Sequence, residues 1–461
     1  MRKLVLCGLL ILALSLTTMG GPAATGSVQA SERVQVRWFV GLGAGSDAPT
    51  IPAQEEVVRR FNESQDEIEL VLEIVDADTA PDVLNTQFAA DNAPDIVGPV
   101  GIKGRAQFPG AWLDLQPLVE KYEYDLSDFD PAMVEFYRTE DGLVGLPFAV
   151  FPSFLFVNLD LFDEAGVPYP PRAYGEPYID IDGNEKEWNL DTLRELAMYL
   201  TVDANGNDPS MEEFDPQNII QFGFGVQFAD LRAAATLFGP GSLVDAEGNA
   251  QIPENWRTAM HWYQDAMWKD YFYPNSAYGQ SELLNNTNWF ESGNIAMVYS
   301  HLWLATCCIN GLEARWDIAP VPSYNGQTIA KLHADTFSIP KGSKHPDEAF
   351  KVLTYLVGEA AGDLTKVYGG MPARSSLQAS YFEELNQLPL FEGKDINWQI
   401  AIDGLKYPDK PSHEGWMPAF LEASDRYGQT WQLIQEDPNV DVDEELDKLQ
   451  ADLQAIFEQA K

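Results

Sequence analysis

Cysteine and histidine are both scarce in this chain of 461 residues. The three cysteines are Cys7, Cys307 and Cys308, which excludes a fold held together by a network of disulfides. The five histidines are scattered without the spacing of a metal-binding pair, so we predict no metal site. Cys307 and Cys308 could form a disulfide in an oxidising compartment, but neighbouring cysteines close only a small, strained ring. Two free buried thiols are an equal alternative at this stage.

Basic residues are also few. The chain has 29 Lys and Arg and 71 Asp and Glu, which gives a net charge of −42. Without residues 1–30 the net charge would be −44. Such a surface repels phosphate backbones and anionic lipid headgroups, so we expect no nucleic-acid partner. The hydrophobic content of 45% is that of a folded globular protein. We therefore interpret the acidity as a solvated surface suited to a salty or acidic habitat.

Signatures of catalysis are missing as well. The glycine-rich loop 41–49 follows a strand-like run, but it lacks the Gly-Lys-Ser/Thr of a phosphate-binding loop and the spacing of a dinucleotide fingerprint. No serine has the pattern of a nucleophile elbow. A glycosidase needs two carboxylates on either side of a sugar. With 71 acidic residues in the chain, such a pair can always be found and does not distinguish an enzyme from a binding protein. We predict no catalytic residue and no cofactor.

Long apolar runs are absent after the first thirty residues. Arg2 and Lys3 precede the apolar run 4–16, and small residues end at Ala30, as in a signal peptide. No later segment approaches the roughly 20 apolar residues of a transmembrane helix. Cys7 lies too early for a lipid-modified cleavage site. We predict an exported protein, periplasmic or associated with the cell surface, and leave open whether it is tethered to the membrane.

Strand and helix patterns alternate through the rest of the chain. Residues 34–40 and 68–75 read as strands, and residues 55–61 between them have the spacing of one helical face. Residues 190–200 and 446–457 read as amphipathic helices that pack on their own core. The order strand, helix, strand predicts a parallel α/β sheet, and the length predicts two lobes. Loops rich in Asp, Asn and Gly, such as 180–184 and 203–208, read as surface turns rather than calcium sites.

Five segments, in order, resemble the extracellular solute-binding proteins of carbohydrate ABC transporters, the class of maltose-binding protein. They span nearly the whole mature chain and are "DNAPDIV" (91–97), "DGLVGLPFAVFPSFLFVNLDLFDEAGVPYPP" (141–171), "WFESGNIAMVYSHLW" (289–303), "DTFSIPKGSKHPDEAFKVLTYL" (335–356) and "GGMPARSS" (369–376). The chain departs from the family at Ala149, Val150 and Phe151, where many relatives carry a hinge carboxylate.

The resemblance implies an α/β, type II periplasmic-binding-protein fold, with two lobes joined by a three-crossing hinge that closes on a ligand. By position, we expect a signal peptide at 1–30, a first lobe at 31–149 and 335–367, and a second lobe at 150–334 and 368–461. The resemblance also implies a monomeric receptor, not an enzyme, that delivers a sugar or oligosaccharide to the permease subunits of an ABC importer.

The twelve tryptophans supply chemistry suited to a sugar. A pyranose has a face of C–H bonds that stacks on aromatic rings and a rim of hydroxyls that hydrogen-bonds to polar groups. The resemblance places Trp303 and Trp416 in the cleft. Further aromatic candidates are Trp289, Phe151 and Tyr299, whereas Trp38, Trp112 and Trp188 are assigned to the core. The candidates for the polar rim are Ser46, Asp47, Lys103 and Asp335.

Two other functions stay open at this stage. The chain could be an exported lyase or glycosidase acting on polysaccharide, or a receptor for a peptide, a polyamine or glycerol phosphate. An acidic protein makes an anionic ligand less natural. The identity, length and linkage of the sugar, and the cognate permease, are not determined by the sequence.

Overall fold

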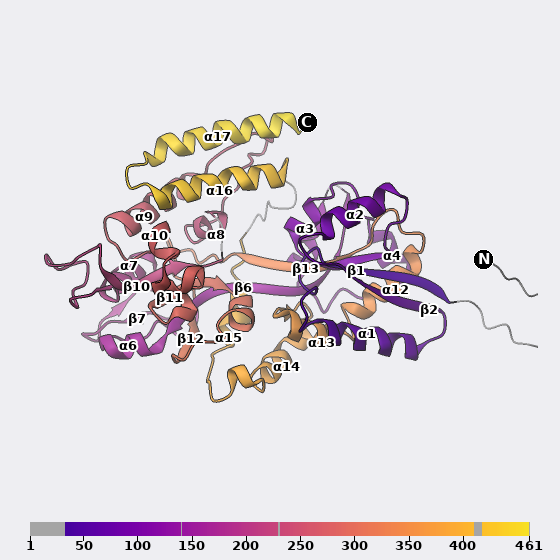
Figure 1. Ribbon diagram of the computed structural model, residues 1–461, viewed down its shortest axis with the longest axis horizontal. Coiled ribbons are helices and arrows are strands. Elements are labelled where there is room, and N and C mark those ends of the chain that lie inside the picture. Colours follow the sequence, from indigo (N-terminus) through magenta and orange to yellow (C-terminus); the bar gives the residue numbers. More distant parts are fainter. Residues whose placement is uncertain (1–32, 140, 229–230, 410–416, 461) are drawn as a thin grey trace, which may run out of the picture.

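The computed structural model describes residues 33–139, 141–228, 231–409 and 417–460 (Figure 1). The predicted signal peptide, Cys7 and Trp416 lie outside these residues. Within the described part, ten strands form one sheet, and two short hairpins stand apart from it. Helices alternate with the strands, as an α/β fold requires.

The first half of the sheet is parallel. β1 (Val34–Val40) pairs along its whole length with β2 (Ile68–Ile74) and at its end with β3 (Ile96–Val100). Parallel neighbours need a crossover, which α1 (Ile51–Ser64) and α2 (Ala80–Ala89) provide. The strands and the helix predicted for this region are confirmed, although α1 begins earlier than its apolar spacing indicated.

Two strands run from this first half into the second (Figure 1). The first residues of β6 (Leu146–Asn158) pair antiparallel with β13 (Leu332–Ser338), which also pairs with β3. The last residues of β6 pair antiparallel with β11 (Ile295–His301) and β12 (Trp316–Ala319). All thirteen residues of β6 are buried, so this strand lies at the centre of the molecule.

The second half continues from β11 into a parallel partner, β10 (Ile219–Val226), and ends at β9 (Val202–Asp203). The short β14 (Met371–Pro372) returns to pair with the beginning of β6. The separate hairpins are β4 (Arg138–Thr139) with β5 (Gly142–Leu143) and β7 (Tyr178–Ile179) with β8 (Glu185–Lys186).

Helices cover both halves. The shorter ones are α3 (Ile102–Ala106), α4 (Gln116–Lys121), α5 (Pro131–Glu135), α6 (Leu159–Ala165), α8 (Leu231–Thr236), α10 (Ser276–Gly279), α11 (Trp303–Cys307), α15 (Gln399–Gly404) and the 3-10 turns η1 (Glu282–Thr287), η2 (Phe290–Ser292) and η3 (Pro389–Phe391). The longer ones are α7 (Leu190–Tyr199), α9 (Glu254–Trp268), α12 (Pro346–Leu356), α13 (Ala361–Tyr368), α14 (Ser375–Leu385), α16 (Phe420–Glu436) and α17 (Val442–Gln459).

The apolar stripes predicted from the sequence face the core. In α17, residues 446, 449, 453, 456 and 457 are buried, and the helix packs on α16 and α9. Trp38, Trp112 and Trp188 are buried too, and each indole N–H donates to a backbone carbonyl. These three tryptophans are structural, as predicted, because their only polar atom is satisfied internally.

Three turns share the pattern Asp-x-x-Gly-Asn, at 180–184, 203–207 and 245–249. In each, the Asp carboxylate accepts the backbone N–H of the Asn four residues later, at 2.7–2.9 Å, and the Gly has a φ of 82–86°. Asp203 alone is fully buried, and it also accepts the N–H of Asp215. Burial would raise the pKa of Asp203, but these N–H donors lower it to about 2. The prediction of plain turns is confirmed.

Two negative findings concern the described residues alone. None of their helices combines the length and the apolar character needed to cross a membrane. They also contain no group of three or more His, Cys, Asp or Glu side chains that could hold a metal ion.

Candidate functional site

Arg105 is a buried cation just beyond the end of β3. It lies on α3, is only 4% exposed, and its guanidinium lies 5.2 Å from the centre of the Tyr137 ring. Its Nε has no hydrogen-bond partner among the described residues. Burial lowers the pKa of Arg105, although Tyr137 and Asp335 oppose the change. A buried donor without a partner is rare in a folded protein and suggests that something else binds there.

Asp335 of β13 faces the same place. Its backbone carbonyl accepts the Tyr137 hydroxyl at 2.9 Å. A Cβ at Gly101 would lie 3.0 Å from Asp335 Oδ1, so the carboxylate fits against the start of α3 because residue 101 is glycine. Burial raises the pKa of Asp335 to about 7, against the opposing effect of Arg105. An acid and a guanidinium are therefore held in one poorly solvated place.

Tyr368, the last residue of α13, connects the glycine-rich loop 41–49 with the Asp335 carboxylate and the Arg105 guanidinium. Its buried hydroxyl has no hydrogen-bond partner within the described chain. Gly45 has a φ of +105°, and a Cβ there would lie 3.3 Å from the Tyr368 hydroxyl. Gln54 Nε2 holds the loop by donating to the Gly45 carbonyl at 2.6 Å. Burial raises the pKa of Tyr368, and Asp335 adds to the rise, so the hydroxyl stays protonated and can donate.

An aromatic cluster surrounds Trp303, the first residue of α11. The Trp303 indole stacks on His301 with ring centres 4.2 Å apart and an angle of 16°. Phe151 and His333 lie 5.4 and 5.2 Å from the same indole. His301 is fully buried, and neither of its ring nitrogens has a partner among the described residues. Burial, helped by His333 and Lys331, holds the pKa of His301 well below its ordinary value, so the ring is neutral.

The polar and aromatic clusters form one site. His333 and Asp335 are two residues apart in β13 and therefore lie on the same face of that strand, about 7 Å apart. A Cβ at Gly370 would lie 2.7 Å from the Phe151 ring, so the turn after Tyr368 packs directly on the aromatic cluster. The site thus joins residues from β6, β11 and β13 with residues from α3, the start of α11 and the end of α13.

The remaining predicted residues lie around this site or apart from it. Ser46 is half-buried and Asp47 exposed on the glycine-rich loop, and Lys103 is exposed on α3. Tyr299 is fully buried, and its hydroxyl bonds to Ser153 at 2.8 Å and accepts the Lys331 N–H at 3.0 Å. It supports the site from beneath and presents no surface to a ligand in this conformation.

Trp289 is not part of the Trp303 cluster. It lines a separate cavity beside the end of β10, and its indole N–H donates to the Gly279 carbonyl at 2.8 Å.

A buried ion cluster lies next to the site. Asp409 accepts from Arg232 at 2.5 Å and from Lys331 at 3.3 Å, and all three residues are at most 5% exposed. Buried charges persist only when paired, so this cluster ties α8, the residue before β13 and the segment around Asp409 together.

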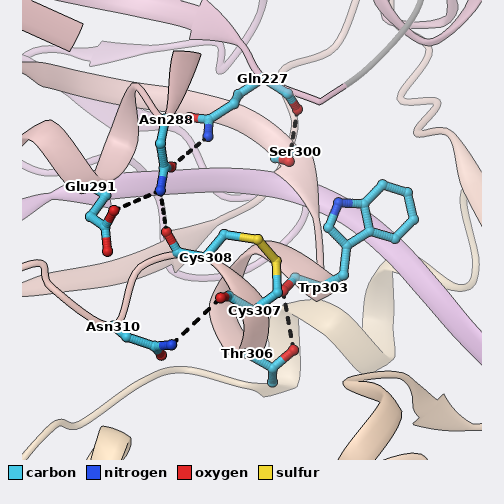
Figure 2. Close-up of a disulfide and its surroundings, with 9 residues drawn as sticks. All are labelled: Gln227, Asn288, Glu291, Ser300, Trp303, Thr306, Cys307, Cys308 and Asn310. Carbon is cyan, nitrogen blue, oxygen red and sulfur yellow. Dashed lines mark hydrogen bonds between the residues drawn. A yellow bond between two sulfur atoms is a disulfide. The ribbon is translucent and has the colours of Figure 1, made fainter. Parts of the chain in front are cut away.

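Cys307 and Cys308 form a disulfide at the end of α11 (Figure 2). The Trp303 indole points away from it, whereas Thr306 Oγ1 donates to the Trp303 carbonyl at 3.1 Å. Asn288 Nδ2 donates to the Cys308 carbonyl at 2.5 Å, and Asn288 Oδ1 accepts from Gln227 at 2.9 Å. The disulfide and these bonds fix the short helix that carries Trp303.

The sequence matches a family model across residues 47–363, which is most of the chain. That model describes bacterial extracellular solute-binding proteins. The chain belongs to this family. Its members bind solutes rather than convert them, so the prediction of a receptor instead of an enzyme is confirmed at the level of the family.

Solved structures share the fold of this solute-binding protein. The ABC substrate-binding protein Lmo0181 of Listeria monocytogenes, in complex with cycloalternan, has 17% identity and a TM-score of 0.69, covering 93% of this chain and 100% of its own. UspC of M. tuberculosis has 20% identity and a TM-score of 0.71, with coverages of 92% and 100%. The sugar-binding protein MalE of Xanthomonas citri has 18% identity and a TM-score of 0.67, with coverages of 92% and 98%. A comparison of the sequence with curated proteins found no match. The solute-binding protein therefore has the α/β periplasmic-binding-protein fold.

Sequence reasoning missed several residues of this site, namely Arg105, Tyr137, Tyr368, His301 and His333. Lys103 was chosen on α3 in place of Arg105. Residues two apart on a helix point to different sides, which is why Lys103 is exposed while Arg105 is buried. A signal was available, because an arginine within a short segment of glycine and apolar residues after a buried strand is unusual.

Proposed function

We propose that this solute-binding protein is the sugar receptor of an ABC importer. The observation that carries the proposal is a set of buried polar atoms on Arg105, Tyr368 and His301 that have no partner among the described residues, together with the Trp303 indole that stacks on His301. Hydroxyl groups of a sugar can donate to and accept from such atoms, and an indole can stack on its C–H face. Structures with the same fold support a sugar, because they have cycloalternan, alpha-D-tagatose, maltose or mannobiose bound.

Each part of the site has a distinct role in this proposal. Trp303 stacks on the sugar ring and supplies affinity, while Arg105 and Asp335 bind hydroxyls in fixed directions and supply selectivity. Asp335, with its pKa of about 7, accepts or donates according to the hydroxyl it meets. Trp416, outside the described residues, would face the sugar from the other side. Ser46, Asp47 and Lys103 would contact its outer rim.

The fold supports a clamp that closes on the sugar. The first lobe would comprise residues 31–149 and 335–367, and the second residues 150–334 and 368–461. The chain would cross between them in β6, in β13 and in the turn before β14. β6 supports this division, because it pairs with β13 and β14 at one end and with β11 and β12 at the other. A few hinge residues would absorb the rotation that buries the ligand.

The proposal includes a place in the cell and a partner. The protein would be exported by its N-terminal segment, act in the periplasm or at the cell surface as a monomer, and release its sugar to the permease subunits. Closure would present both lobes to the permease at once, so that only a loaded receptor is recognised.

Isothermal titration calorimetry tests the proposal. The panel contains glucose, maltose, maltotriose, mannose, mannobiose, tagatose and acarbose, with spermidine, a tripeptide and glycerol 3-phosphate as non-sugar solutes. We expect micromolar or tighter binding to at least one neutral sugar, and chromatography should find that sugar unchanged after incubation. Binding to a non-sugar solute alone, or release of a shorter sugar, would refute the proposal.

A further inference from the structure

A second cavity, the Trp289 pocket, lies beside the end of β10. It has a volume of about 310 Å³, within the range of small-molecule sites, and its aromatic lining comes from Trp289, Trp431 and Phe228. Phe228 is 46% exposed. The lining therefore offers aromatic faces that the protein itself does not cover.

Among the described residues, the polar lining of the Trp289 pocket carries no charge. Its polar side chains are amides and hydroxyls, among them Asn275, Ser276, Gln280 and Gln435, although the chain has 71 acidic residues. Three other surface cavities formed by the described residues each include at least one carboxylate. Amides and hydroxyls both donate and accept, so this lining suits a neutral polyhydroxylated ligand better than an ion.

The Trp289 indole is tightly packed in the wall of the pocket. A Cβ at Gly225 or at Gly279 would lie 2.9 Å from atoms of the Trp289 ring, so only glycine leaves room for the indole at both positions. The Tyr273 ring packs against Trp289 edge to face, with centres 6.0 Å apart. The indole is therefore held in one orientation, as a stacking surface requires.

The rim of the pocket is strained. Thr287 has a φ of +90°, a genuine outlier for a β-branched residue, and it follows Asn285 and Asn286 at φ of 50° and 49°. Asn288 fixes the segment through its bonds to Glu291, to the Cys308 carbonyl and to Gln227 (Figure 2). Strain maintained by such bonds concentrates at ligand sites.

The Trp289 pocket and the Trp303 site are neighbours. β10 and β11 run parallel with Val226 paired to Tyr299, and Ser300 Oγ donates to the Gln227 carbonyl at 2.9 Å. Phe228 and His301 therefore leave the same edge of the sheet from adjacent strands, which lie about 4.8 Å apart. Phe228, which lines the pocket, therefore lies beside His301, which stacks on Trp303.

We propose that the Trp289 pocket is a second subsite, which takes a further residue of a neutral oligosaccharide whose first residue stacks on Trp303. This inference rests on the proposed function and adds to it that the ligand is longer than a monosaccharide. Trp289 and Phe228 would contact the faces of the further sugar ring, and Gln435 and Gln280 its hydroxyls.

Titration calorimetry with sugars of increasing length tests the subsite. The probes are glucose, maltose, maltotriose and maltotetraose, and mannose with its linear oligomers of the same lengths. Wild type and the variants Phe228→Ala and Gln435→Ala are compared. The matched controls are Gln432→Ala, on the same helix but outside the pocket lining, and Tyr199→Ala, an aromatic 48% exposed on α7.

We expect wild-type affinity in one series to rise about tenfold, which corresponds to about 1.4 kcal/mol, with the residue that reaches the pocket. Phe228→Ala and Gln435→Ala should remove most of that gain and leave the shortest sugar that binds unaffected, while both controls match wild type. Equal affinity at all lengths, or an equal loss at all lengths, would overturn the subsite but not the receptor. Absence of binding by every sugar would overturn both proposals.

Discussion

Replacement of Arg105 by methionine separates a binding role from a structural one. The guanidinium is 4% exposed, its Nε lacks a partner among the described residues, and its one favourable ring contact is with Tyr137. That contact is desolvated, so its loss removes about 2 kcal/mol. Burial of a charge without full compensation costs several kcal/mol, which the substitution relieves. We therefore expect the free energy of unfolding without sugar to stay level or rise, by about 1–2 kcal/mol.

Sugar affinity should change in the opposite direction. Hydrogen bonds from a charged donor contribute about 1.5–3 kcal/mol, so Arg105→Met should weaken binding about 10- to 150-fold. Urea unfolding measures the free energy of unfolding, and titration calorimetry with the sugar that binds most tightly measures the affinity. Lys448→Met, on α17 and with its side chain 64% exposed, is the control and should change neither. A variant that is destabilised yet binds sugar normally would show that Arg105 is structural and that our reasoning is wrong.

Three further predictions concern other residues. Trp303→Ala and Trp416→Ala should each weaken sugar binding by about 1–3 kcal/mol, by analogy with aromatic stacking on nucleic-acid bases. If calorimetry finds the sugar affinity of both variants unchanged, neither tryptophan belongs to the site. Because the pKa of His301 is held below its ordinary value of 6.5, the unfolded chain takes up a proton that the folded one does not. Stability should therefore fall as the pH drops below 6.5, by at most about 1.4 kcal/mol per pH unit, and His301→Phe should flatten urea-unfolding profiles between pH 7.5 and 5.5. In thermal unfolding, Asp203→Ala should lower the Tm more than Asp245→Ala, because Asp203 is fully buried and also holds Asp215; equal losses would contradict this.

The aromatic candidates show where sequence reasoning reached its limit. Trp303, Phe151 and Trp289 were singled out together, yet only the first two lie in one cluster. Trp289 packs between Gly225 and Gly279, at the end of the neighbouring strand. Their separation depends on which way each side chain leaves its strand or turn, and composition and spacing do not encode that direction.

The disulfide gives a second example. Two neighbouring cysteines were compatible with a disulfide or with free thiols, because the choice depends on the local backbone. The structure pairs them at the end of α11, where Asn288 holds the Cys308 carbonyl. Asn288 is twenty residues away in sequence, so no local pattern indicated this contact.

The sequence by itself determined the local features of this protein. Apolar periodicity set the strands of the first half and the amphipathic α7 and α17, and the Asp-x-x-Gly-Asn turns follow from hydrogen bonds within five residues. Ordered motifs along the chain indicated the family. Tertiary structure alone decided the site, because Arg105, Asp335, Tyr368 and His301 come from distant segments. Arg105, Tyr368 and His301 each bury a polar atom that lacks a partner among the described residues, and they do so because β6 and β13 bring the two halves together, which is a property of packing and not of any one segment.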